Sequence, residues 1–160
     1  MPKTYEPIAT TTLGSAASSV TFSSIPSTYT DLVLVASGTN TTSAQSVRMT
    51  FNGITTTTYS RTAIFGDGSS AQSTRDSNAT GIDNIYYGTT QGVAILQIMN
   101  YANTTTNKTV ISRNNDSASS VNAVVGLWRS TNAINQITLT AQTSNFATGS
   151  TFTLYGIRSA

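Results

Sequence analysis

Few side chains in this sequence could do chemistry, and most of them are carboxylates. The chain has no His and no Cys, so a Ser-His-Asp site, a Cys-His site and a Cys-ligated metal centre are excluded. A pair of carboxylates could in principle hydrolyse a glycoside. The candidates are Glu6, Asp31, Asp67, Asp76, Asp83 and Asp116, and no spacing marks two of them as a pair.

One glycine-rich turn could in principle hold a metal ion. Gly66-Asp67-Gly68 precedes Asp76 and Asp83, and Ca²⁺ is bound by carboxylate and carbonyl oxygens. The spacing does not match an EF-hand loop, and Asp in such turns commonly serves the turn itself.

A Ser-Lys dyad would need Lys3 or Lys108, and neither stands in a supporting motif. We therefore predict that the protein is not an enzyme and holds no metal or cofactor.

Aromatic side chains are the better candidates for a functional contact. Tyr86 and Tyr87 are adjacent, and the single Trp, Trp128, is followed by Arg129. An exposed aromatic platform near amides would suit a sugar, whereas a lone Trp at a strand end also serves as a core lid or an interface anchor. We predict these four residues as interface or glycan contacts, and the core alternative stays open for Trp128.

Charge is sparse and dispersed along the chain. Eight Lys and Arg against six Asp and Glu give a net charge of +2, and charged residues make up 9% of the sequence. No basic cluster resembles a nucleic-acid footprint. No apolar run approaches the roughly 18 residues of a membrane helix, and the first residues lack the apolar segment of a secretory signal. We therefore predict neither a nucleic-acid nor a membrane partner.

Short apolar runs and alternating patterns predict β-strands. Ser and Thr make up about a third of the chain, which suits strand surfaces and loops. The expected strands cover residues 19–23, 31–36, 46–52, 82–87, 92–101, 108–113, 121–129, 134–141 and 151–157. Residues 55–65 form either a short strand or an irregular crossover, and 66–78 are loop-like. This spacing predicts one antiparallel β-sandwich, jelly-roll-like, with about eight strands.

The first 17 residues differ from the rest and predict an extended N-terminal arm. Pro2 and Pro7 oppose regular strand pairing, and Tyr5, Ile8 and Leu13 are the only anchors. A purely solvated tail would have little use for three such side chains. We therefore divide the chain into an arm, residues 1–17, and a β-sandwich domain, residues 18–160, and expect the three anchors to contact a capsid or a neighbouring subunit.

Several segments together resemble a known group of proteins. They are residues 5–9, 22–26, 29–35, 49–53 with Tyr59, 126–134 and 145–157. In combination these segments resemble small virion proteins of tailed bacteriophages, notably marine and cyanobacterial ones. The resemblance implies a jelly-roll structural component of the particle, and it carries no catalytic residues.

The expected function follows from this resemblance and from the scarcity of reactive side chains. We expect a capsid decoration (cement) protein that binds and stabilises the outside of the head shell. Its partners would be the major capsid protein and further copies of itself, as a homotrimer, and it would be made in the host cytoplasm and reside on the virion surface. The alternatives are a tail-fibre or tail-tip module that recognises host carbohydrate, and a tail or neck structural component.

Overall fold

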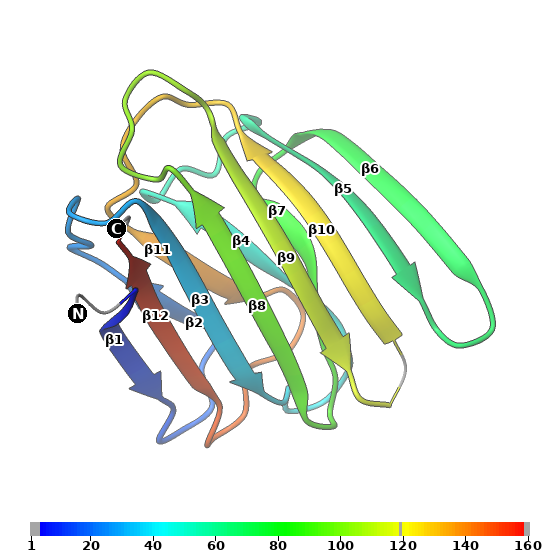
Figure 1. The fold of residues 1–160 in the computed structure, drawn as a ribbon. Helices are drawn as coiled ribbons and strands as arrows, with labels where there is room; N and C mark the ends of the chain where they lie inside the picture. The colour runs from blue at the N-terminus through cyan, green and yellow to red at the C-terminus, as the bar shows by residue number, and fades with distance from the viewer. Residues whose placement is uncertain (1–3, 119, 159–160) are drawn as a thin grey trace.

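The computed structural model describes residues 4–118 and 120–158, and only the backbone of Asn84. These residues form twelve β-strands in two antiparallel sheets, and no helix occurs among them (Figure 1). The predicted all-β sandwich is confirmed, and the predicted count of about eight strands is wrong. No helix that could cross a membrane is found in this part of the chain.

The larger sheet contains eight strands in the order β1-β12-β3-β8-β9-β10-β5-β6. Their bounds, in that order, are β1 (Tyr5–Thr12), β12 (Thr151–Ile157), β3 (Asp31–Gly38), β8 (Gly92–Met99), β9 (Lys108–Asp116), β10 (Ser120–Trp128), β5 (Tyr59–Gly66) and β6 (Ala71–Ala79). Residues 31–36, predicted as a strand, lie within β3, which is inside the sheet between β12 and β8.

The smaller sheet contains four strands in the order β2-β11-β4-β7. Their bounds are β2 (Ser19–Phe22), β11 (Ile137–Ala141), β4 (Gln45–Phe51) and β7 (Ile82–Tyr87). This sheet lies behind the larger one in Figure 1, with β7 packed against β9, β10 and β5. One face of the larger sheet is thereby covered, and we call the opposite face its outer face.

The core lies between the two sheets because side chains alternate along each strand. On β8, Ala94, Leu96 and Ile98 are buried, as the alternation in the sequence predicts. β4 contributes Val47 and Met49 from the smaller sheet, both fully buried. Every second residue of the larger sheet is therefore left on the outer face.

An aromatic cluster closes one end of the core. The rings of Tyr59 and Trp128 stack with centroids 6.1 Å apart, and Phe51 lies 5.5 Å from Trp128. The Tyr59 hydroxyl accepts a hydrogen bond from the Phe51 amide at 2.9 Å and donates one to the Ile54 carbonyl at 3.0 Å. Burial raises the pKa of Tyr59 to about 12. Tyr59 therefore fixes the connection between β4 and β5.

Asn52-Gly53 forms the turn after β4, with φ of 52° and 69°. Both angles lie in the left-handed region, which Asn and Gly tolerate best. The Asn52 side chain also accepts hydrogen bonds from the amides of Asn135 and Gln136 and donates one to the Ala133 carbonyl. The turn therefore anchors the loop before β11 as well.

Residues 66–78, predicted as a loop, are mostly strand. β6 spans Ala71–Ala79 and pairs with β5 in a hairpin closed by Asp67, whose side chain accepts from the amides of Ser69 and Ser70 at 2.8 Å. Most side chains of β6 are exposed or half-buried on both faces. Because neither face is apolar, the sequence carries no alternation that would predict a strand there.

The described part of the predicted arm belongs to the sandwich of its own chain. Residues 5–12 form β1, an edge strand paired with β12. Pro7 is accommodated because β1 has no partner on its other side and because the register shifts between Pro7 and Ala9. Pro2 and Lys3 lie outside the described residues. The expected contact of this segment with another subunit stays a prediction, as does the division at residue 17.

Candidate interaction surface

The outer face of the larger sheet exposes a group of large apolar side chains. Five of them, which we call the apolar face, are Ile64, Val93, Ile111, Val121 and Val125, and between 39% and 66% of each is exposed. Single exposed apolar residues are normal on protein surfaces, whereas contiguous groups mark interaction sites. The relative positions of these five residues therefore matter.

Strand register places four of the five side chains near one another, and Asn115 lies between Val93 and Val121. Val125 lies directly opposite Ile111 on β9, and Ala123 lies opposite Ile64 on β5. The remaining two members of the apolar face stand on β10 and β8, so all five occupy four adjacent strands, β8, β9, β10 and β5. Directly opposed side chains in antiparallel strands have Cβ atoms about 5 Å apart. The exposed side chains therefore form one surface.

The sequence of β10 explains why this surface is apolar. Val121, Ala123 and Val125 point outward, whereas Val124 and Trp128 are buried in the core. Apolar residues on both sides of a strand are typical of a sheet that is covered on both faces. No described residue of the chain forms a second layer over the outer face. The outer face therefore combines exposed apolar side chains with no cover from the described residues.

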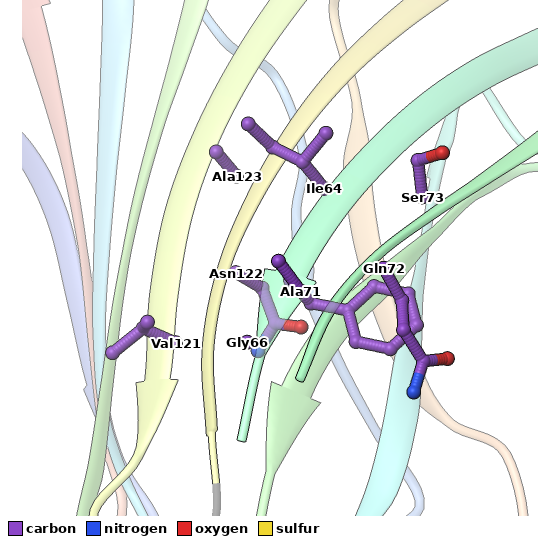
Figure 2. Close-up of a pocket in the computed structure, with 9 residues that line it drawn as sticks. Ile64, Gly66, Ala71, Gln72, Ser73, Val121, Asn122 and Ala123 are labelled. Atoms are coloured by element: carbon purple, nitrogen blue, oxygen red, sulfur yellow. The ribbon is translucent and has the colours of Figure 1, made fainter. Parts of the chain in front are cut away.

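The larger sheet is hollowed at the end where β10, β5 and β6 meet. A shallow hollow of about 640 Å³ is lined by Ile64, Phe65, Gly66, Ala71, Gln72, Ser73, Val121, Asn122 and Ala123. The lining includes residues of both faces, because Phe65, Gln72 and Asn122 alternate with the outward Ile64, Ser73 and Ala123. Figure 2 shows Ile64 and Ala123 side by side on neighbouring strands, with Ala71 and Val121 close by. The lining is mostly apolar, and its polar groups are Ser, Asn and Gln side chains without charge.

Two arginines supply the charge of this face. Arg113 stands on β9 between Ile95 of β8 and Ala123 of β10, and Arg75 stands on β6. Both are exposed, and neither forms an ion pair with a described residue. Asp31, at the start of β3, accepts a hydrogen bond from the Asn100 amide at 2.6 Å. The part of the outer face between β9 and β6 is therefore apolar and positively charged.

Two of the four residues predicted as interface or glycan contacts are core residues. Trp128 and Tyr87 are each 1% exposed, so the prediction of a surface contact is wrong for both. Trp128 faces inward because it follows the buried alternation of β10. Tyr87 packs edge-on against Phe146 at 6.2 Å, and burial raises the pKa of Tyr87. The core alternative for Trp128 is the one that the structure bears out.

The other two predicted contacts are half-buried and serve local structure. The Tyr86 amide donates a hydrogen bond to Asn114 Oδ1 at 2.8 Å. The Arg129 guanidinium donates to the Thr57 carbonyl at 2.7 Å and to Asn78 Oδ1 at 3.3 Å, which ties the β4–β5 connection to the end of β6. These four residues therefore do not form one aromatic platform.

The three anchors predicted in the N-terminal segment have different environments. Tyr5 is 56% exposed, and its ring meets Tyr155 edge-on at 6.4 Å. Ile8 and Leu13 are half-buried and pack against the core of their own chain. Of the three, Tyr5 presents the most surface to a partner, and the role of all three as contacts stays a prediction.

Three of the six carboxylates are held by arginines. Asp83 accepts from Arg48 Nε at 2.8 Å and from its Nη2 at 3.1 Å. Asp76 pairs with Arg61, and Glu6 with Arg158. The Asp83 partner raises the pKa of Arg48, chiefly through the side-chain hydrogen bond. These carboxylates link neighbouring strands or segments.

The remaining groups considered for catalysis also have structural partners. The amides of Ser70 and Ser69 lower the pKa of Asp67 by donating hydrogen bonds to its carboxylate. Asp116 accepts from the Thr90 hydroxyl at 2.8 Å. Lys108 is buried, which lowers its pKa, and its ammonium group donates to two backbone carbonyls. Among the described residues, no three His, Cys, Asp or Glu side chains gather where a metal ion could bind.

The sequence interpretation missed the apolar face, although β10 carried a signal for it. Residues 121–125 include apolar side chains in both alternating sets, and the sequence predicted only a strand over residues 121–129. Ile64 was missed because the 55–65 segment had no clear period. Which apolar set faces outward depends on the position of the smaller sheet, and that position is a tertiary property.

Comparison with known proteins finds only distant structural likenesses. No protein-family model and no curated protein sequence matches the chain. A crystal structure of exo-inulinase from Aspergillus awamori is similar over 96% of this chain, at 16% identity and a TM-score of 0.47. The chain spans 29% of the length of that protein. The alginate lyase Aly36B is similar over 94% of this chain and 79% of its own, at 9% identity and a TM-score of 0.31.

These likenesses do not identify an activity. A mutant of Aly36B in complex with alginate tetrasaccharide gives a TM-score of 0.30 at 9% identity, over the same shares of the two chains. All three scores lie below 0.5, so they argue neither for nor against catalysis. The absence of enzymatic activity therefore stays a prediction.

Proposed function

We propose that the protein is a structural component of a tailed-phage particle that binds the outside of the head shell through its outer sheet face. The observation that carries the proposal is the apolar face, five exposed side chains on four adjacent strands with no second layer from the described chain. The sequence resemblance to small phage virion proteins supports the choice of partner. The scarcity of reactive side chains supports a role in binding.

The size of the outer face suits a stable protein interface. Strands lie about 4.8 Å apart and rise about 3.3 Å per residue, so six strands of about eight residues present about 760 Å². In the order of the sheet, the six strands β3, β8, β9, β10, β5 and β6 have eight or nine residues each. A standard interface buries about 800 Å² on each partner. The face therefore has room for one complete interface.

The charge of the face favours a different protein over a second copy as its occupant. If two copies met through this face around a two-fold axis, the same surface would meet itself. Both copies would then bring Arg113 and Arg75 into an apolar, poorly hydrated contact without a carboxylate from this part of the face to pair with them, which costs free energy. A shell surface with apolar side chains and carboxylates opposite the two arginines fits better.

Binding of this kind stabilises the shell by mass action. A protein that binds the assembled shell and not its dissociated subunits adds its binding free energy to the stability of the shell. No catalytic group is required. The expected homotrimer is a separate prediction, which measurement of the mass of the free protein tests.

The carbohydrate-binding alternative has lost its main support. It rested on Tyr86, Tyr87 and Trp128 as an aromatic platform, and two of these side chains are buried in the core. A tail or neck position stays an alternative, and copy number separates it from a position on the head.

The experiment is a quantitative gel or mass-spectrometric analysis of purified virions. We expect a molar amount comparable with that of the major capsid protein. A protein present in a handful to tens of copies per particle would assign it to the tail or neck and contradict the proposal. Addition of the purified protein to heads that lack it should raise their dissociation temperature. Unchanged stability at saturating protein would contradict the stabilising role.

A further inference from the structure

The two sheets end in four edge strands, and three of these edges are protected. Natural proteins blunt edge strands with proline, irregular pairing, short length or cover from other groups. β1 carries Pro7 and a register shift, and β2 has four residues. β7 also has a shifted register, and Asn114 Oδ1 accepts the hydrogen bond of the Tyr86 amide.

β6 is the fourth edge, and it is less protected than the others. It has nine residues, contains neither proline nor lysine, and carries two charged residues, Arg75 and Asp76. Its register with β5 shifts only beyond Asp76, so residues 71–76 pair regularly, and no described strand lies on their other side. Figure 1 shows the β5–β6 hairpin extending past the smaller sheet. A long, regular and open edge is a template for pairing with another strand.

We propose that β6 pairs antiparallel with β6 of a second copy and joins the two larger sheets into one continuous sheet. The proposal does not rest on the proposed function, because it concerns the free protein. It uses the edge of the sheet and leaves the outer face open. Two outer faces would then lie side by side, so that a dimer could bind a repeating surface through both of them.

The hairpin register identifies the backbone groups that would pair. The Asp67 amide donates to the Ser70 carbonyl at 3.3 Å, which makes these two residues a hydrogen-bonded pair at the turn. Hydrogen-bonded and non-bonded pairs alternate along an antiparallel ladder. The alternation points the backbone N–H and C=O groups of Ser73 and Arg75 away from β5. These groups are available to a second copy.

Charge and length select one register for the pairing. If Arg75 lay on the two-fold axis, two like charges would oppose each other, which is unfavourable. If Ser73 lay on the axis, its strand would run into the Gly68-Ser69 turn of the second copy and the ladder would be short. With Thr74 on the axis, residues 71–77 pair in full. Arg75 then lies opposite Ser73 of the second copy on the outer side.

The first experiment measures the mass of the full chain by sedimentation equilibrium across a range of concentrations. We expect a reversible dimer, in place of the homotrimer expected from the sequence. Ser73→Pro removes the outward donor from each copy and keeps the β5 ladder, so the dissociation constant should rise about 30-fold. Ser73→Thr keeps the donor and should retain the dimer. A circular-dichroism spectrum and a melting temperature of the proline variant, at a concentration where both proteins are monomeric, check that it folds.

The second experiment tests the register with charge and does not depend on the proline variant. Ser73→Glu places a carboxylate opposite Arg75 of the second copy at two symmetric positions, and should tighten the dimer about fivefold. Ser73→Lys places like charges there and should weaken it by a similar factor. Both effects should shrink at high salt. Equal dissociation constants for the two variants would overturn the register.

Three outcomes would overturn the pairing itself. They are a monomer at millimolar concentration, a trimer as the sequence resemblance led us to expect, and a dimer whose dissociation constant is the same for the Ser73→Pro and Ser73→Thr variants. None of these outcomes bears on binding through the outer face, which is measured on particles. Failure of this inference is therefore distinguishable from failure of the proposed function.

Discussion

Removing apolar side chains from the outer face should weaken shell binding without unfolding the protein. The perturbation is the double variant Val121→Ser, Val125→Ser. The two side chains are 66% and 54% exposed in the free chain, so more than half of each is available for burial by a partner. Both point away from the core. Exposed substitutions of this kind change folding stability by about 0.5 kcal/mol or less.

The magnitude follows from this exposure. Complete burial of a valine side chain stabilises by about 1.5–3 kcal/mol, so burial of the exposed part contributes about 1 kcal/mol. Two such losses amount to about 2 kcal/mol, which corresponds to about a 30-fold increase in the dissociation constant. The two sites are four residues apart on one strand and should be close to additive.

The assay is co-sedimentation of the purified protein with heads that lack it, over a concentration series. Ile54→Ser is the matched control, because Ile54 is also a partly exposed apolar residue (37%) and lies in the β4–β5 connection, away from the outer face. We expect the control to bind like the wild type. Equal affinities for the double variant and the control would refute the assignment of the outer face.

Three further predictions concern the fold that presents this face. Tyr59→Phe leaves two backbone groups without their hydroxyl partner and should lower the free energy of unfolding by about 2 kcal/mol in urea titration, whereas Tyr155→Phe, on the half-exposed outer side, should change little. Burial raises the pKa of Tyr59 to about 12 in the folded state. The free energy of unfolding of the wild type should therefore fall as the pH rises above about 10, and that of Tyr59→Phe should fall less. An equal fall in the two proteins would contradict this linkage. Gly126→Ala places a Cβ 2.6 Å from Ile82 Cδ1 and should cost about 1–3 kcal/mol by overpacking, and an unchanged melting temperature would show that Ile82 moves freely.

The β-sandwich was predictable because its central strands carry strong local patterns. β8 alternates between two apolar sets, and β4 alternates between apolar and polar residues, so both strands were found within a few residues of their bounds. The Asn52-Gly53 turn after β4 follows the same local logic, because its backbone angles suit these two residue types. β6 was missed because a polar edge strand with two exposed faces has no periodicity to detect.

The candidate site was less predictable, because burial is decided by the assembled sheets. Trp128 and Tyr87 were predicted as surface aromatics from their residue type, and their position in the alternation put them in the core. Val121 and Val125 were counted as ordinary strand residues, and the absence of a second layer over β10 makes them the exposed ones. Side-chain type indicated the chemistry of a contact, and the arrangement of the sheets determined which side chains can make it.

A reconstruction of the purified virion at a resolution that separates sheets tests the central claim most directly. The proposed function predicts this protein on the outside of the head, with the outer face of β8, β9, β10 and β5 against the shell and the smaller sheet toward solvent. A reconstruction that places the protein in the tail, or that places it on the head with Val121 and Val125 facing solvent, would contradict the account.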